Sequence, residues 1–191
     1  MSPRLTSATF AATGVLFLLY PLLRPSGDDA AALASTGWVL GHVAAMLGFV
    51  LLGVGMFGLH GLLGGGAAVL TWVGAGLTLP YYGAETFALN VVAREGAALT
   101  AVAQEFRLDP VAATMFALGL LLLAAGTVTA ALAIKRSGLL SAWSGMPLAA
   151  GFALFLPQFF APVYALRIAH GVLIAAGALW LAVEVWRSRA A

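Results

Sequence analysis

The chain has 191 residues and a net charge of +2, and 62% of its residues are hydrophobic while only 8% are charged. Because soluble domains carry about 25% charged residues, this composition excludes a water-soluble fold and predicts one all-α domain, residues 1–191, of transmembrane helices in a lipid bilayer. The basic residues form no stripe, which excludes nucleic-acid binding, and the absence of cysteine excludes disulfides and thiolate metal sites.

Apolar runs of about 20 residues predict six membrane-spanning helices, because about 20 residues at 1.5 Å each cross the hydrocarbon core. The first run follows Arg4 and could be read as a signal peptide, but the small-residue site Ala32–Ala34 lies well beyond the end of the run. We therefore expect this run to remain as the first helix. The six helices are expected at residues 6–23, 35–63, 67–93, 110–134, 142–160 and 163–186.

Glycine and proline give these helices local features. Gly37 and Gly41 are one helical turn apart in the second helix and allow a close helix contact, within the bundle or between protomers. Pro80 predicts a kink in the third helix, and Pro157 predicts a break in the fifth. Pro110 suits the first turn of the fourth helix.

The segment between the third and fourth helices, residues 95–108, is amphipathic. Leu99, Val102 and Phe106 recur at helical spacing, with charged residues at the other positions. This pattern predicts a short helix lying in the membrane interface. It is either an ordinary connection or a lid over a cavity.

The distribution of lysine and arginine favours an orientation with both termini in the cytoplasm, because cytoplasmic loops are enriched in these residues. The protein is then a multi-pass protein of the cell membrane, of the bacterial inner-membrane type. The inner side would hold Arg4, Lys135, Arg136, Arg187 and Arg189, and the outer side Arg24, Arg94, Arg107 and Arg167.

Glu85 is the most informative residue, because a carboxylate within the hydrocarbon is costly and usually faces a cavity, a partner or a transport path. Tyr81 and Tyr82 lie four and three residues before it and share its helix face. Arg167 and His170 share a face of the sixth helix. We therefore expect Glu85 to pair with Arg167 or to hydrogen-bond to His170.

On the six-helix topology the polar side chains fall in the same half of the bilayer, and reversing the orientation does not disperse them. This convergence predicts one polar pocket, although an ion pair that merely fastens two helices is the alternative. The candidate catalytic residues are Glu85, His170, Arg167 and His42, and the candidate substrate-binding residues are Tyr81, Tyr82, Gln158, Tyr164 and Phe159.

The leading functional hypothesis is acid–base chemistry on a lipophilic small molecule such as an isoprenoid, with no cofactor and no metal. A carboxylic acid that burial keeps protonated can donate a proton, and a neighbouring histidine can take one back. The protein would be a membrane-embedded isomerase or cyclase, or would open an epoxide. The chain has no aspartate-rich diphosphate motif, no G-x-S-x-G and no H-E-x-x-H.

Two alternatives remain open at this point. Pro80 and Pro157 would interrupt helices at matching depth, as in small proton-coupled transporters, and such a transporter or binding protein would act as a homodimer. His42 and His170 lie at similar depth on different helices and would suit a b-type haem electron carrier.

Overall fold

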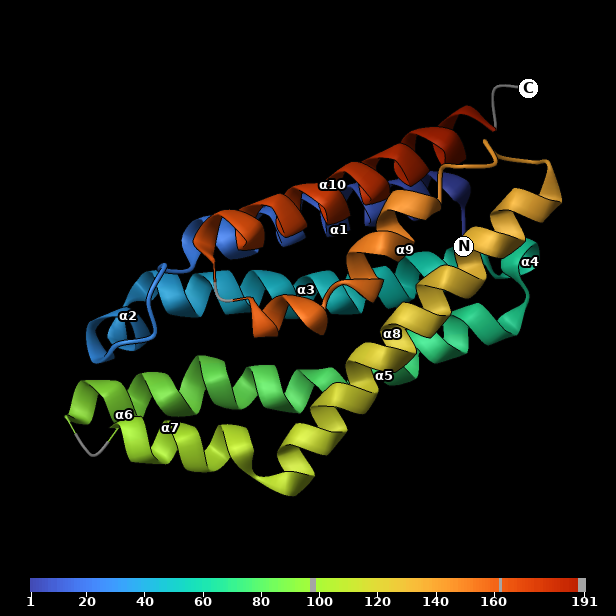
Figure 1. The fold of residues 1–191 in the computed structure, drawn as a ribbon. Coiled ribbons are helices and arrows are strands. Elements are labelled where there is room, and N and C mark those ends of the chain that lie inside the picture. Colours follow the sequence, from blue (N-terminus) through green and yellow to red (C-terminus); the bar gives the residue numbers. More distant parts are fainter. Residues whose placement is uncertain (97–98, 162, 189–191) are drawn as a thin grey trace.

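The computed structural model describes residues 1–96, 99–161 and 163–188, and every secondary-structure element within these ranges is helical (Figure 1). This confirms the predicted all-α class. The number of membrane crossings and the orientation of the termini stay predictions. Four helices are long and apolar enough to cross a membrane, namely α1 (Pro3–Leu23), α3 (Thr36–Gly58), α8 (Pro110–Ser137) and α10 (Tyr164–Arg187).

Two short helices flank α3. Asp29 caps the first of them, α2 (Ala30–Ala34), by accepting a hydrogen bond from the backbone of Ala32. The second, α4 (His60–Leu63), follows a break at Leu59 and ends at Gly64, whose φ of +71° favours glycine. The helix predicted over residues 35–63 is therefore divided in two.

The third predicted helix is one continuous path with an irregular turn. It consists of α5 (Gly65–Gly83), the π-helical turn η1 (Ala84–Ala88) and α6 (Leu89–Glu95). The chain stays helical through Pro80, and the irregularity lies one turn later, around Glu85. Because π-helical turns frequently occur at functional sites, this position of Glu85 is notable.

The fifth predicted helix, residues 142–160, is not a continuous helix. Only α9 (Met146–Ala153) is α-helical there, and the 3₁₀ turn η2 (Pro157–Phe160) follows it. Pro157 has no backbone N–H to donate to the carbonyl oxygen of Ala153, and α9 ends at that residue.

The predicted interfacial segment forms α7 (Leu99–Leu108), which lies alongside α6 (Figure 1). Asp109 then caps α8 by accepting hydrogen bonds from the backbone nitrogens of Val111 and Ala112, at 3.0 and 2.8 Å. This sharp turn folds α7 back against the bundle.

The bundle is built on close helix pairs. In it, α1 packs against α3 and α10, α5 packs against α8, and α9 packs against α8 and α10. A Cβ atom at Gly37 would lie 2.6 Å from the carbonyl oxygen of Leu23, and one at Gly41 would lie 3.0 Å from that of Tyr20. Both glycines therefore serve the α1–α3 contact within the chain.

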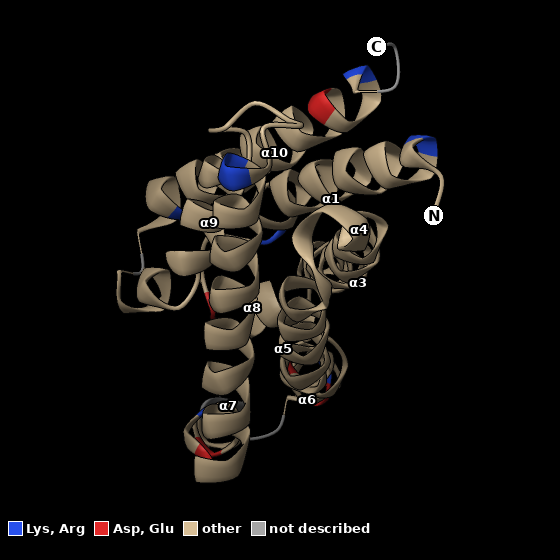
Figure 2. Ribbon diagram, turned by 90° about the vertical axis from the view of Figure 1, so that its right-hand side faces the viewer, with Lys and Arg blue, Asp and Glu red and all other residues tan. Residues whose placement is uncertain are grey.

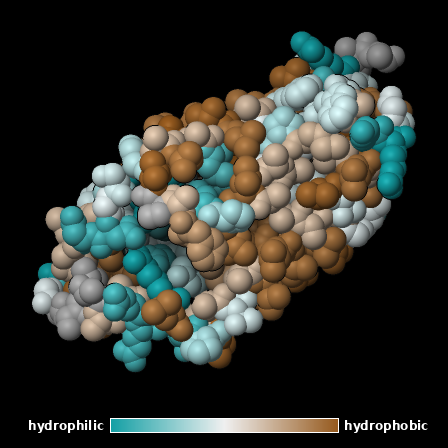
Figure 3. Space-filling view, in the orientation of Figure 1, coloured by the Kyte–Doolittle hydropathy of each residue, from teal (hydrophilic) through white to brown (hydrophobic). Residues whose placement is uncertain are grey.

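The charged residues lie mainly towards the two ends of the bundle (Figure 2), and a hydrophobic band separates the hydrophilic regions on the face seen in Figure 3. Large apolar side chains are exposed along the helices, such as Leu121 on α8 and Val183 on α10. A helical bundle with an apolar exterior is the arrangement expected of a membrane protein.

Candidate functional site

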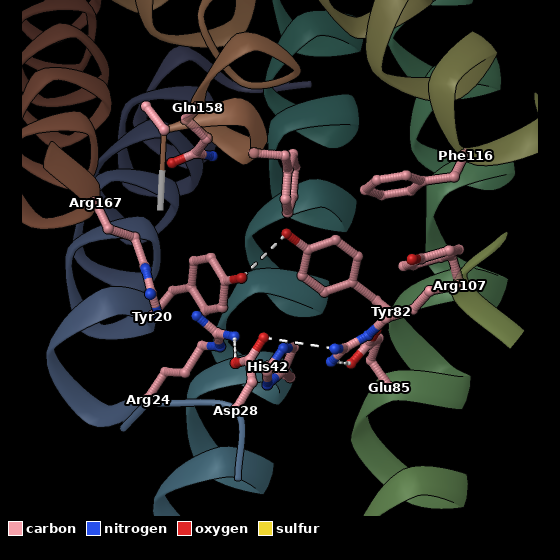
Figure 4. A pocket seen from close by; sticks show the side chains of 13 residues that line it. Tyr20, Arg24, Asp28, His42, Tyr82, Glu85, Arg107, Phe116, Gln158 and Arg167 are labelled. Atoms are coloured by element: carbon pink, nitrogen blue, oxygen red, sulfur yellow. Dashed lines mark hydrogen bonds and ion pairs between the residues drawn. The ribbon is translucent and has the colours of Figure 1, made fainter. Parts of the chain in front are cut away.

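A cavity of about 220 Å³ lies within the bundle, towards the end that carries α2, α6 and α7. Its walls come from eight elements and the α1–α2 link. In Figure 4, Gln158 and Arg167 lie on one side and Glu85, Arg107 and Phe116 on the other. Charged, aromatic and amide side chains from distant parts of the sequence thus share one space.

Glu85 is held by Arg107 through two parallel hydrogen bonds. The Nε of Arg107 donates to Oε1 at 2.6 Å, and its Nη2 donates to Oε2 at 2.8 Å. The side chain of Glu85 is only 9% exposed, whereas that of Arg107 is 27% exposed. The hydrogen bonds to Glu85 raise the pKa of Arg107 further above its ordinary value, so the guanidinium stays charged.

The pair continues into a chain of four charges. Arg107 Nη1 lies 3.5 Å from a carboxylate oxygen of Asp28, which also pairs with Arg24. The Arg24 guanidinium lies 4.5 Å from the ring centroid of Trp38, in a cation–π contact. The alternating signs neutralise four of the charges around the cavity in pairs.

A small cluster of buried side chains, here called the second core because it is separate from the main core of the bundle, places Arg107 opposite Glu85. It is formed by the buried side chains of Leu33, Trp38, Leu89 and Ala103, with Phe106 packed against them. This core joins α2, α3 and α6 to α7. The last turn of α7 is thereby held beside η1.

Aromatic rings complete the wall above Arg107. Tyr81 lies between Phe106 of α7, at 4.8 Å between ring centroids, and Phe116 of α8, with which it stacks at 4.1 Å. Phe159 of η2 contacts Phe116 edge to face at 5.5 Å. These rings make one side of the cavity apolar.

His42 is buried among aromatic rings on the cavity wall. Its Nδ1–H donates to the carbonyl oxygen of Trp38 at 2.8 Å, which leaves Nε2 as a hydrogen-bond acceptor in the neutral imidazole. The ring centroids of Trp38, Tyr20 and Tyr82 lie 4.4, 5.4 and 5.7 Å away. The imidazole is therefore fixed in tautomer and orientation.

The π-helical turn is tied to α3 by Trp38, whose indole Nε1–H donates to the carbonyl oxygen of Glu85 at 2.7 Å. On the α1 side, the hydroxyl groups of Tyr20 and Tyr82 lie 3.5 Å apart. The same indole thus supports both the cation of Arg24 and the backbone of Glu85.

The structure brings seven of the nine residues proposed from the sequence to this cavity, and the exceptions are Tyr164 and His170. Tyr164 is 40% exposed at the start of α10. The Nε2 of His170 is hydrogen-bonded to the carbonyl oxygen of Gly151 in α9, at 2.7 Å. The seven are His42, Tyr81, Tyr82, Glu85, Gln158, Phe159 and Arg167.

The partner expected for Glu85 was wrong. Arg167 instead reaches the link between α1 and α2, where it donates to the carbonyl oxygens of Pro25 and Ser26 at 3.4 and 3.3 Å. His170 is turned towards α9. The sequence predicted that the acid and most of the other candidates lie close together, but the fold supplies the cation from α7.

Six cavity residues were not among the candidates, namely Tyr20, Arg24, Asp28, Arg107, Phe116 and Ala161. Tyr20 lies in the last turn of α1, whereas Arg24 and Asp28 follow its last residue, Leu23, so helical periodicity could not have assigned all three. The sequence signal for Arg107 was weaker, because Arg107 reaches the cavity only when α7 folds back over the bundle.

The haem alternative needs two histidines that face one iron. His42 lines the cavity, whereas His170 does not and is bonded to Gly151. The cavity therefore does not combine the two ligands that this alternative requires.

Comparison of the chain with protein-family models, with curated proteins and with solved structures gave no match. The functional interpretation therefore depends on the site itself.

Proposed function

We propose that the protein binds a small lipophilic molecule with a polar end in this cavity. The observation that carries the proposal is the convergence of charged, imidazole and phenol side chains on one space between membrane-type helices. Polar side chains in such positions are costly and tend to be functional. One ion pair would be enough to fasten two helices.

The cavity itself also favours a ligand. The cavity is lined by polar side chains and opens beside Phe159, so water or a ligand can fill it. The volume corresponds to about seven waters at about 30 Å³ each, so it suits a small molecule or one end of a longer one.

We further propose that the chain crosses a cell membrane six times with both termini in the cytoplasm. The first turn of α1 and the last turn of α10 lie at the same end of the bundle (Figure 1). At that end Lys135 lies 4.5 Å from the ring of Trp143, and Arg4 lies 6.0 Å from the ring of Trp186. Lysine and arginine are enriched on the cytoplasmic side, and tryptophan is enriched at either membrane interface. The path α5–η1–α6 and the broken unit α9–η2 would be the additional crossings.

The experiment that tests ligand binding is the identification of co-purified lipophiles by mass spectrometry. Ala161 lines the cavity, so Ala161→Trp should fill part of it, whereas Ala153 is exposed on α9 and Ala153→Trp is the matched control. We expect a lipophile in the wild-type and Ala153→Trp extracts and its loss from Ala161→Trp. Identical extracts from all three proteins would contradict the proposal.

Acid–base chemistry on the bound molecule is a second candidate, and the geometry of His42 favours it. The Nε2 atom is free to accept a proton because Nδ1–H is bonded to Trp38. Both oxygens of Glu85 accept hydrogen bonds from Arg107, so Glu85 acts here as an anchor for that cation. His42 would accept the proton, and the neighbouring hydroxyls of Tyr20 and Tyr82 would supply one, as an isomerisation requires.

His42→Gln tests this second candidate once the co-purified molecule is known. If His42 is the base, the variant should still bind the molecule but convert it at least a hundredfold more slowly, since general bases contribute about 10²–10⁴-fold. Turnover at the wild-type rate would refute the role. For the transport alternative, the irregularity in the third predicted helix is the π-helical turn Ala84–Ala88 after Pro80, and the other helix ends before Pro157.

A further inference from the structure

The charges around the cavity do not cancel. Three guanidinium groups and two carboxylates line it, which leaves one positive charge. The carboxylates of Asp28 and Glu85 are engaged by Arg24 and Arg107. The surplus charge therefore lies on Arg167.

Arg167 has no carboxylate partner among the described residues. Its two terminal nitrogens contact only the carbonyl oxygens of Pro25 and Ser26, at 3.4 and 3.3 Å. These are long hydrogen bonds to neutral acceptors, and the guanidinium also lies 5.8 Å from the ring centroid of Tyr164, so no anion in the described chain balances its charge. The side chain is partly buried and lines the cavity (Figure 4).

A second guanidinium offers an unused donor at the same cavity. The Nε atom of Arg24 is buried and has no hydrogen-bond partner in the described chain, and its side chain is only 11% exposed. Its Nη2 already binds Asp28. Because a buried donor without an acceptor is destabilising, an acceptor supplied by a ligand would be favoured here.

We infer that the cavity binds the anionic head group, carboxylate or phosphate, of a lipophilic acid, with Arg167 as the principal contact and Arg24 as the second. The inference rests on the proposed function and specifies the class of ligand. It also assigns to Arg167 a role other than pairing with Glu85.

The shape of the cavity favours an amphiphile over a free anion. About 220 Å³ holds a head group and several carbon atoms, and the stacked rings of Tyr81 and Phe116 provide an apolar surface. Phe159 lines the cavity and is also 47% exposed, so the cavity reaches the apolar exterior beside it. A longer tail would leave the cavity at that point and enter the lipid.

The test is equilibrium binding of radiolabelled octanoate and octanol to the full chain in nanodiscs of neutral phosphatidylcholine, with empty nanodiscs subtracted. The two probes share a tail and differ in head-group charge. We expect wild-type protein to bind octanoate at least tenfold more tightly than octanol. Arg167→Gln should reduce this preference to less than threefold, and Arg167→Lys should retain part of it. Arg94→Gln is the matched control, because Arg94 is exposed on α6, and it should leave the preference unchanged.

Each other outcome is decisive. Equal binding of octanoate and octanol would overturn the anionic head group while leaving the proposed function intact, whereas no binding of either would contradict both. Displacement of octanoate by an equal concentration of acetate or inorganic phosphate would show a free-anion site and overturn the amphiphile. If Arg167→Gln does not fold, the wild-type preference and its retention in Arg167→Lys still decide the question.

Discussion

Glu85 and Arg107 form one ion pair, but removing either residue should lower the stability of the fold by a different amount. Removing one partner of a buried pair costs about 3–5 kcal/mol, because the other charge is left without compensation. The side chain of Glu85 is 9% exposed, so Arg107→Gln strands a buried carboxylate and should cost about 3–4 kcal/mol. The side chain of Arg107 is 27% exposed and lies 3.5 Å from Asp28, so Glu85→Gln should cost only about 2 kcal/mol.

The double variant should be more stable than the sum of the single effects predicts, with a coupling energy of about 1.5–2.5 kcal/mol. The assay is unfolding in mixed detergent micelles, followed by the loss of helical circular dichroism. Glu105→Gln and Arg94→Gln remove exposed charges from α7 and α6, and each should change the stability by less than about 0.5 kcal/mol.

The main test is which of the two single variants loses more stability. If Glu85→Gln destabilises the protein as much as Arg107→Gln, the argument from unequal burial is refuted. A coupling energy below about 0.5 kcal/mol would show that the two hydrogen bonds do not act as a unit.

Three further substitutions test the packing that builds the cavity. A Cβ atom at Gly74 would lie 2.7 Å from backbone atoms of α8, so Gly74→Ala should lower the melting temperature by several degrees, whereas Gly76→Ala, in open space on the same helix, should leave it unchanged or raise it. Trp38→Phe removes the indole donor to the carbonyl of Glu85 and should cost about 1–3 kcal/mol in the same unfolding assay; a loss below about 0.5 kcal/mol would mean that another donor replaces it. Asn90→Leu removes a 2.7 Å hydrogen bond to the backbone of α2, and amide hydrogen exchange should rise in α2 but not in α8; equal exchange in both would contradict the local role.

The sequence alone decided the all-helical class of the protein and the gathering of most of its polar candidates around one space. Composition required helices in an apolar solvent, and the apolar runs located α1, α3, α8 and α10 within a few residues. Periodicity also placed Tyr81, Tyr82 and Glu85 on one helix face, and all three line the cavity. These properties depend on local spacing and on transfer free energies, which the sequence displays directly.

The partners of the charged groups were decided only by the tertiary structure. Glu85 could have met Arg167, His170 or Arg107, since each is brought near the same end of the bundle by the order of the helices. The second core around Leu33 and Trp38 selects Arg107 by holding α7 against η1. That selection depends on side-chain packing between segments distant in sequence, which periodicity does not encode.

The irregular turns were likewise a tertiary result. Two prolines gave the same local signal, yet α5 continues through Pro80 while the chain at Pro157 becomes a 3₁₀ turn. The close contacts of α5 with α8 at Gly74 and Gly119 hold the helix before Pro80, and Tyr81 stacks on Phe116 of α8 directly after it. By contrast, η2 contains no buried residue. Proline removes one hydrogen bond in both places, and the surrounding packing decides whether the helix survives that loss.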